Sequence, residues 1–260
     1  MRNFLRPCLF SVLLLAGCAD LNFYSDEDLE PLSVQAYAEA QEQYPEVKSG
    51  PDHDMVQRVA QKIAAASGEN FAWEAKLLKA DDVVNAFCLP NGRIAVYTGI
   101  LPVTQNEDAL AAVLGHEVAH ATKRHGGKRM TQGMLTQAGL TAADLAMGLG
   151  KMSDESKGMV MGVLGAGAQY GVLLPYSREH ESQADIEGIR YAIRAGYDPN
   201  EAPKLWERMA ALGSGGPAWL STHPDPMSRA AKLRELIPQI LEEEKNWQPK
   251  KAVAPGAVGQ

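Results

Sequence analysis

The chain has no internal repeat, no block of like charge and few cysteines among its 260 residues. The absence of a repeat excludes a helical module of the tetratricopeptide type. The absence of a basic surplus, with a formal net charge of -7, disfavours binding to polyanions, so we expect no nucleic-acid partner. What is present, 45% hydrophobic and 22% charged residues, is ordinary for a globular protein and excludes collagen-like, coiled-coil and wholly disordered chains.

Long apolar runs are also scarce, and the first of them is short. Leu9–Ala16 follows the positively charged Arg2 and Arg6 and is too short to span a bilayer as a helix. A positive start, a short apolar stretch and small residues after it are typical of a secretory signal. Because the small residues end in Cys18, as in a bacterial lipobox, we predict a lipoprotein signal peptide over 1–17 and lipidation of Cys18.

The three cysteines then allow no intramolecular disulfide. Cys8 leaves with the signal and Cys18 carries the lipid, so Cys88 stands alone and is expected to be a buried structural thiol. Asp20 comes two places after Cys18. An aspartate directly after the lipidated cysteine favours retention in the inner membrane. Its position one place later favours a periplasmic protein anchored in the outer membrane.

The mature chain divides into a tether, one folded domain and a tail. We expect the lipidated cysteine, a tether and an N-terminal helix within 18–50, with 19–33 as the polar tether. A single domain should cover 51–245, followed by a flexible tail over 246–260. The domain is predicted to be α+β and mostly α, with a small sheet of about three strands. The strands are expected over 71–78, 83–89 and 93–98.

One later segment has the length of a membrane span. Residues 159–176 carry no charge, and 18 such residues lie at the lower limit for crossing a bilayer. Their many glycines, together with Gln169 and Pro175, favour a glycine-rich helix packed inside the domain. The preceding stretch, 133–157, is rich in Gly, Met and Ala, and we expect it to be a mobile flap.

The strongest chemical signal is His-Glu-Val-Ala-His at 116–120, a pattern that a chain of this composition would contain only about 0.01 times by chance. An apolar stripe places it on a helix. Asn106 is suited to cap the start of that helix, and Gly126 and Gly127 are expected to end it.

The spacing within this motif suits a metal ion and a proton acceptor. His116 and His120 are four residues apart, so both imidazoles project from one helix face and can bind one ion. Glu117 lies beside them, where it can take a proton from water activated by the metal.

Two histidines do not complete the site, because a catalytic zinc takes three protein ligands. Candidates follow Pro175, where a new helix is predicted. Glu181 and Asp185 share a face of that helix, so one carboxylate can bind the metal while the other accepts the free N–H of a ligand histidine. From the residues alone the third ligand stays open among Glu179, His180, Glu181 and Asp185.

Several stretches together resemble a family of zinc metallopeptidases, peptidase family M48. It holds the CAAX prenyl endopeptidases, the membrane protease HtpX and the periplasmic BepA- and LoiP-type lipoproteins. The resemblance covers roughly residues 50–243 and implies a gluzincin-like domain whose sheet packs on the HExxH helix. The matching stretches are 85–101, 116–120 with 124–125, 176–178, 181–185 and 222–224.

The resemblance also implies a role for each matching residue. His116, His120 and Glu181 would bind one Zn²⁺ per chain, with Glu117 as the general base. Asp185 would not bind the metal itself but would lie behind the residues that do.

For His223, in the Thr-His-Pro motif, the resemblance leaves two roles open. The imidazole can approach the zinc and restrain the enzyme, or it can stabilise the oxyanion of the reaction. Arg229 is a second candidate for the oxyanion charge. His53, His125 and His180 are expected to have no catalytic role. Residues 93–98 match the family's edge strand, to which a substrate chain can add as an extra strand.

The chain lacks both the helical repeats of the BepA type and the multiple spans of the prenyl proteases, so it resembles the short, lipid-anchored periplasmic branch. These features predict a zinc-dependent endopeptidase whose substrates are unfolded or misassembled envelope polypeptides. The alternative is a chaperone-like assembly factor for outer-membrane proteins whose protease activity is latent.

Overall fold

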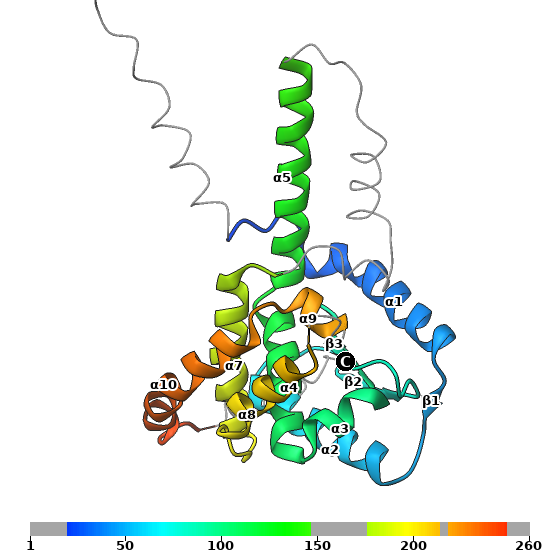
Figure 1. The fold of residues 1–260 in the computed structure, drawn as a ribbon. Coiled ribbons are helices and arrows are strands. Elements are labelled where there is room, and N and C mark those ends of the chain that lie inside the picture. The colour runs from blue at the N-terminus through cyan, green and yellow to red at the C-terminus, as the bar shows by residue number, and fades with distance from the viewer. Residues whose placement is uncertain (1–19, 147–175, 214–217, 249–260) are drawn as a thin grey trace, which may run out of the picture.

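Helix α4 runs through the middle of the molecule, with a small sheet on one side and helices on the other (Figure 1). The computed structural model describes residues 20–146, 176–213 and 218–248. The predicted class, mostly α with a small sheet packed on the motif-bearing helix, is confirmed. The helices are α1 (Asp26–Gln43), α2 (Pro51–Ser67), the 3₁₀ turn η1 (Thr98–Ile100), α3 (Leu101–Thr104), α4 (Glu107–Thr122), α5 (His125–Ala146), α7 (Arg178–Arg194), α8 (Glu201–Ala211), α9 (Ala218–Thr222) and α10 (Pro226–Glu244). The strands are β1 (Glu46–Val47), β2 (Glu74–Leu78), β3 (Ala86–Cys88) and β4 (Arg93–Tyr97).

The described part of the sheet has four strands in the order β1-β2-β4-β3. Strands β2 and β4 are parallel, whereas β1 and β3 pair antiparallel with β2 and β4 respectively. The three predicted strands are present, and the two-residue β1 is added to them. The expectation that 93–98 form an edge strand is wrong, because β4 is hydrogen-bonded on both sides. The edge beside it is β3.

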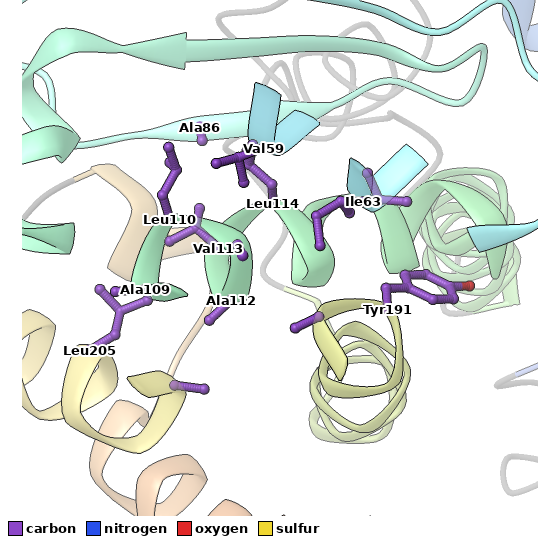
Figure 2. Close-up of a cluster of buried hydrophobic side chains, with 14 of the residues drawn as sticks. Val59, Ile63, Ala86, Ala109, Leu110, Ala112, Val113, Leu114, Tyr191 and Leu205 are labelled. Atoms are coloured by element: carbon purple, nitrogen blue, oxygen red, sulfur yellow. The ribbon is translucent and has the colours of Figure 1, made fainter. Parts of the chain in front are cut away.

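Helix α4 is enclosed by its neighbours. Every residue from Ala109 to Thr122 is buried, so the helix is covered on all sides rather than along one apolar stripe. Figure 2 shows Leu110 and Leu114 directed toward β3 and α2 while Ala109 meets Leu205 of α8. A helix held on several sides gives its polar side chains little freedom to move.

The crossing of α4 and α7 brings two backbones into contact at a pair of glycines. A Cβ atom added to Gly115 would lie 2.6 Å from the carbonyl oxygen of Gly188, and one added to Gly188 would lie 2.7 Å from the carbonyl carbon of Gly115. No larger residue fits at either position without moving a helix. This close approach brings side chains of the two helices within reach of one another.

The folded part of the chain begins nearer to the N-terminus than the composition suggests. Helix α1 begins at Asp26, capped by Ser25, and buries Leu29 and Ser33. Further along it, the Tyr37 hydroxyl donates to the Ile94 carbonyl of β4. The expectation of a polar tether through residue 33 is therefore wrong, because the acidic residues there lie on the outer face of a packed helix.

Helix α4 ends sooner than predicted. It stops at Thr122, and Arg124 adopts a left-handed conformation with φ of 57°. A new helix, α5, begins at His125, takes in Gly126 and Gly127, and projects from the rest of the molecule (Figure 1). The glycines therefore lie within the next helix and do not end α4.

Two expectations fall mostly outside the described residues. Of the stretch 133–157, the part up to Ala146 lies in α5. Of the stretch 159–176, only Tyr176 is described. Within the described ranges, no helix is both long enough and apolar enough to cross a membrane.

Candidate metal centre

The two motif histidines lie on one face of α4, as predicted. The Asn106 side chain accepts from the Ala109 amide at 2.8 Å and caps the helix. One helical turn separates His116 and His120, and their Nε2 atoms are 3.0 Å apart. The i,i+4 spacing therefore brings two nitrogen donors to one point.

A carboxylate from α7 reaches the same point. Ser177 caps α7 by accepting from the His180 amide, and Glu181 follows in the first turn. Glu181 Oε1 lies 3.3 Å from His120 Nε2, and Oε2 lies 3.6 Å from His116 Nε2. Of the four alternatives left open by the residues alone, Glu181 is the one that joins the two histidines in a cluster able to hold a metal ion.

A third imidazole completes the cluster. His223 directly follows the short helix α9. Its Nδ1 lies 3.0 Å from Glu181 Oε1 and 3.2 Å from His116 Nε2. The ring stacks on Trp219 with a centroid distance of 4.3 Å. His223 therefore faces the donors of the other three residues directly.

These four side chains fit a zinc ion. Their ligand atoms all lie within 4.8 Å of one another, and the donor pairs given above are 3.0 to 3.6 Å apart. Bonds of about 2.0–2.1 Å in a tetrahedral arrangement place neighbouring donors about 3.3 Å apart. Nitrogen and carboxylate donors are also the types that zinc takes in catalytic sites. All four residues are at most 3% exposed.

Asp185 and Arg229 form the next layer behind these donors. Asp185 Oδ1 is 3.0 Å from His116 Nδ1, on the side of the ring away from the cluster. Arg229 donates to both Asp185 oxygens, at 2.6 and 2.8 Å, and its Nη1 lies 2.8 Å from Glu181 Oε2. The guanidinium also lies over the Trp206 ring, 4.4 Å from its centroid. Arg229 is thus engaged by two carboxylates behind the donors.

His125 and Gln183 hold the outer side of His120. His125 Nδ1 lies 2.9 Å from His120 Nδ1, and His125 Nε2 lies 3.0 Å from Gln183 Oε1. The sequence predicted no catalytic role for His125 and did not single out Gln183. His125 follows His120 by five residues, which is off the helical period, and it reaches the site only because the chain turns at Arg124.

Glu117 lies at the edge of the cluster. Its Oε1 accepts from the Trp219 indole at 2.9 Å and is 3.5 Å from His223 Nε2. Trp219 was not singled out from the sequence, since a lone tryptophan has no motif. The carboxylate is thereby oriented beside the donors without being one of them.

Burial and close charges shift several pKa values in this cluster. Burial lowers the pKa of His120 well below its usual value and that of His125 to about 3, so both rings are neutral near pH 7. Burial opposes ionisation of Glu181, but His223, His116 and hydrogen bonds together outweigh it and lower its pKa. For Asp185, Arg229 outweighs burial in the same direction and keeps the pKa low.

Aromatic rings cover the cluster. Tyr176 stacks on His120 with centroids 3.9 Å apart, and its amide donates to the Thr222 carbonyl at 3.1 Å. This bond ties the segment before α7 to the segment before His223. The covered arrangement agrees with the burial of all the donors.

The remaining singled-out residues lie apart from the donors or in supporting positions. His53 is on α2 and pairs with Asp54. His180 stacks on His125 with centroids 4.4 Å apart. Cys88 is a free cysteine on β3 whose thiol pKa is raised by burial. Cys18 lies outside the described residues.

A helix-borne HExxH pair joined by a glutamate from a second helix defines a metallopeptidase of the gluzincin type. Residues 50–237 match the model of peptidase family M48, and the chain belongs to this family.

Curated proteins that are similar to the chain include mitochondrial metalloendopeptidases and beta-barrel assembly-enhancing proteases. The chain is 38% identical over 188 residues to the mitochondrial metalloendopeptidase OMA1 of Schizosaccharomyces pombe, covering 71% of this chain and 52% of that protein. It is 32% identical over 207 residues to the OMA1 of Danio rerio, covering 75% and 42%. It is 31% identical over 165 residues to the beta-barrel assembly-enhancing protease of Escherichia coli, covering 62% and 34%. The chain thus spans about half the length, or less, of these relatives.

Proposed function

We propose that this chain is a zinc-dependent endopeptidase that hydrolyses misfolded or misassembled polypeptides in the bacterial periplasm. The observation that carries the proposal is the convergence of His116, His120 and Glu181 on one point, with Glu117 held beside it. Family membership supports peptide bonds as the reaction class.

In the reaction, each side chain has a task that its surroundings suit. His116, His120 and Glu181 hold the zinc, which when bound polarises the scissile carbonyl and makes water more acidic. Glu117, oriented by the Trp219 indole, accepts a proton from the attacking water and passes it to the leaving amine. Asp185 fixes the tautomer of His116, and Arg229 positions Asp185 and Glu181.

His223 acts as a restraint in this proposal. Its Nδ1 lies among the donors, where it takes the position that substrate and water need. The enzyme therefore rests in a closed form, and hydrolysis requires His223 to move away. Arg229, held by two carboxylates, is a positioning residue here and does not supply charge to the oxyanion.

A second function is favoured by the same closed form. A chaperone-like assembly factor for outer-membrane proteins would carry this fold with a latent protease, and the covered donors support latency. The relative named beta-barrel assembly-enhancing protease supports such a role. We favour the protease because the positions for metal ligands and proton acceptor are all filled.

The reaction is tested with an unfolded model protein as substrate. Glu117→Gln keeps the size of the side chain but cannot accept the proton, so hydrolysis should fall by about 10²–10⁴-fold with zinc content unchanged. Glu187→Gln is the matched control, because Glu187 pairs with Lys123 away from the donors. Hydrolysis by Glu117→Gln at the wild-type rate would contradict the proposed mechanism.

Replacing His223 separates restraint from oxyanion stabilisation. His223→Ala should raise proteolysis, including self-cleavage, if the ring caps the metal. A fall of about 10²–10³-fold would instead assign it to the oxyanion. Unchanged hydrolysis would contradict both roles.

The anchor is tested by Cys18→Ser. A lipid-anchored periplasmic protein should lose incorporation of labelled fatty acid and leave the outer-membrane fraction, either as soluble protein or as unprocessed precursor. Unchanged labelling and fractionation would contradict the lipoprotein assignment and, with it, the proposed location.

A further inference from the structure

The outer nitrogen of His120 faces another imidazole, whereas that of His116 faces a carboxylate. His120 Nδ1 and His125 Nδ1 are 2.9 Å apart, and neither ring is more than 2% exposed. Two ring nitrogens at this distance share one proton between a donor and an acceptor. The tautomer of each ring is therefore set by that of the other.

The contact of His125 with Gln183, on the side away from His120, determines which ring nitrogen carries the proton. Gln183 Nε2 lies 3.4 Å from the Glu179 carboxylate, which can only accept, so the amide oxygen is turned toward His125. His125 Nε2 lies 3.0 Å from that oxygen and must therefore be the protonated nitrogen. Its Nδ1 is then a free acceptor for the N–H of His120.

The consequence reaches the metal centre. A proton on His120 Nδ1 leaves Nε2 with its lone pair directed at the donors of His116 and Glu181. We propose that His125 and Gln183 form a positioning relay that fixes the tautomer and ring orientation of His120 for metal binding. This inference rests on the proposed zinc site and assigns a role to a histidine for which the sequence predicts none.

The packing around His125 suits such a role. His125 is the first residue of α5 and follows the left-handed Arg124, so the backbone there is fixed by the turn between two helices. On one side its ring stacks on His180, with centroids 4.4 Å apart and planes inclined by 16°. The fixed backbone and the stacking on His180 together keep Nδ1 of His125 directed at His120.

The test measures zinc affinity by competition with a chromophoric chelator, together with the visible spectrum of the Co²⁺-substituted protein. His125→Phe keeps an aromatic ring for stacking but removes the acceptor, and should weaken zinc binding about 10–100-fold and shift the cobalt bands. His125→Gln supplies an amide oxygen as acceptor and should recover part of the affinity. His53→Phe is the matched control and should leave both readouts unchanged, because His53 pairs with Asp54 at the start of α2 and is outside the donor cluster.

A second pair of variants keeps the test decisive if His125→Phe fails to fold. Gln183→Leu removes the acceptor for His125 and should weaken zinc binding, whereas Gln183→Glu keeps an acceptor oxygen and should weaken it less. A wild-type chain that binds no zinc would overturn the proposed function itself. A wild-type chain that binds zinc, with equal affinity and an equal cobalt spectrum in His125→Phe or Gln183→Leu, would overturn the relay alone.

Discussion

The two halves of the metal centre are built in different ways. His116, Glu117 and His120 come from a single buried helix turn, so their relative positions follow from helical geometry. Glu181 and His223 come from α7 and from the residue after α9, and they reach the same point only through packing between distant segments. The first half is a local property of the chain, and the second is a property of the fold.

This difference implies that a mutation can disturb one half of the metal centre without disturbing the other. The local half needs α4 to form, while the distant half needs α7 to pack correctly against α4 and α10 to pack against α7. The contacts that hold the distant half are the Gly115–Gly188 crossing and the pairing of Arg229 with Asp185. Changes to these contacts should disturb metal binding as well as stability, whereas changes at the start of α4 should disturb stability alone.

The largest effect is expected from removing the distant carboxylate. Glu181→Ala deletes a donor and should lose most of the bound zinc, as should His116→Ala in the local half. Metal analysis of the purified variants checks this, with Glu187→Ala as the matched control because Glu187 lies on the same helix, pairs with Lys123 and is outside the donor cluster. Full zinc occupancy in Glu181→Ala would refute its assignment as a ligand.

The next effect is expected from the buried arginine. Arg229→Gln leaves Asp185 and Glu181 without their buried partner and should cost about 3–5 kcal/mol of unfolding free energy. Urea unfolding measures the cost. Arg234→Gln breaks an exposed pair with Glu207 and should cost no more than about 1 kcal/mol. Equal costs in the two variants would contradict the role given to Arg229.

The local half could be predicted from the sequence, and much of the distant half could not. The spacing of His116 and His120 determines how their side chains lie relative to each other, because the period of an α-helix is known in advance. The sheet was predicted without β1, since two residues carry no pattern. The family resemblance predicted an edge position for β4, and the residues themselves could not correct this because strand order depends on long-range pairing. The residues alone left Glu181 as one of four candidates for the third ligand, and the resemblance of the chain to a family singled it out.

The residues that were missed share a physical cause. His125 and Trp219 reach the site through chain turns and helix packing, neither of which leaves a period in the sequence. The end of α4 was misplaced because Arg124, a residue that seldom adopts positive φ, makes the break instead of a glycine. Such features are decided by the tertiary structure, where neighbours can outweigh local preference.

A smaller effect is expected at the helix crossing. Gly188→Ala places a Cβ 2.7 Å from the Gly115 backbone and should cost about 1–3 kcal/mol by forcing α7 away from α4. Zinc affinity should fall with it, because Glu181 moves with α7. Gly126→Ala is the control, since its Cβ meets only Pro90 at 3.5 Å, and it should be neutral or stabilising. Gly188→Ala with wild-type stability would contradict the close crossing.

The smallest effect is expected at the start of α4. Asn106→Ala removes the cap on the Ala109 amide and should cost about 1 kcal/mol without changing zinc affinity. Thermal unfolding and chelator competition check the two parts separately. Asn200→Ala should cost less, because the Asn200 side chain makes no capping bond to α8. A loss of zinc affinity in Asn106→Ala would show that the halves are coupled more tightly than proposed.

The central claim is that the local and the distant half of the metal centre bind the same ion. X-ray absorption at the zinc edge tests it most directly. The account predicts one zinc per wild-type chain bound by three imidazole nitrogens and one carboxylate oxygen, from His116, His120, His223 and Glu181. His223→Ala should show one imidazole fewer, with the other donors kept. A chain without zinc, or a first shell that is identical in wild type and His223→Ala, would contradict it.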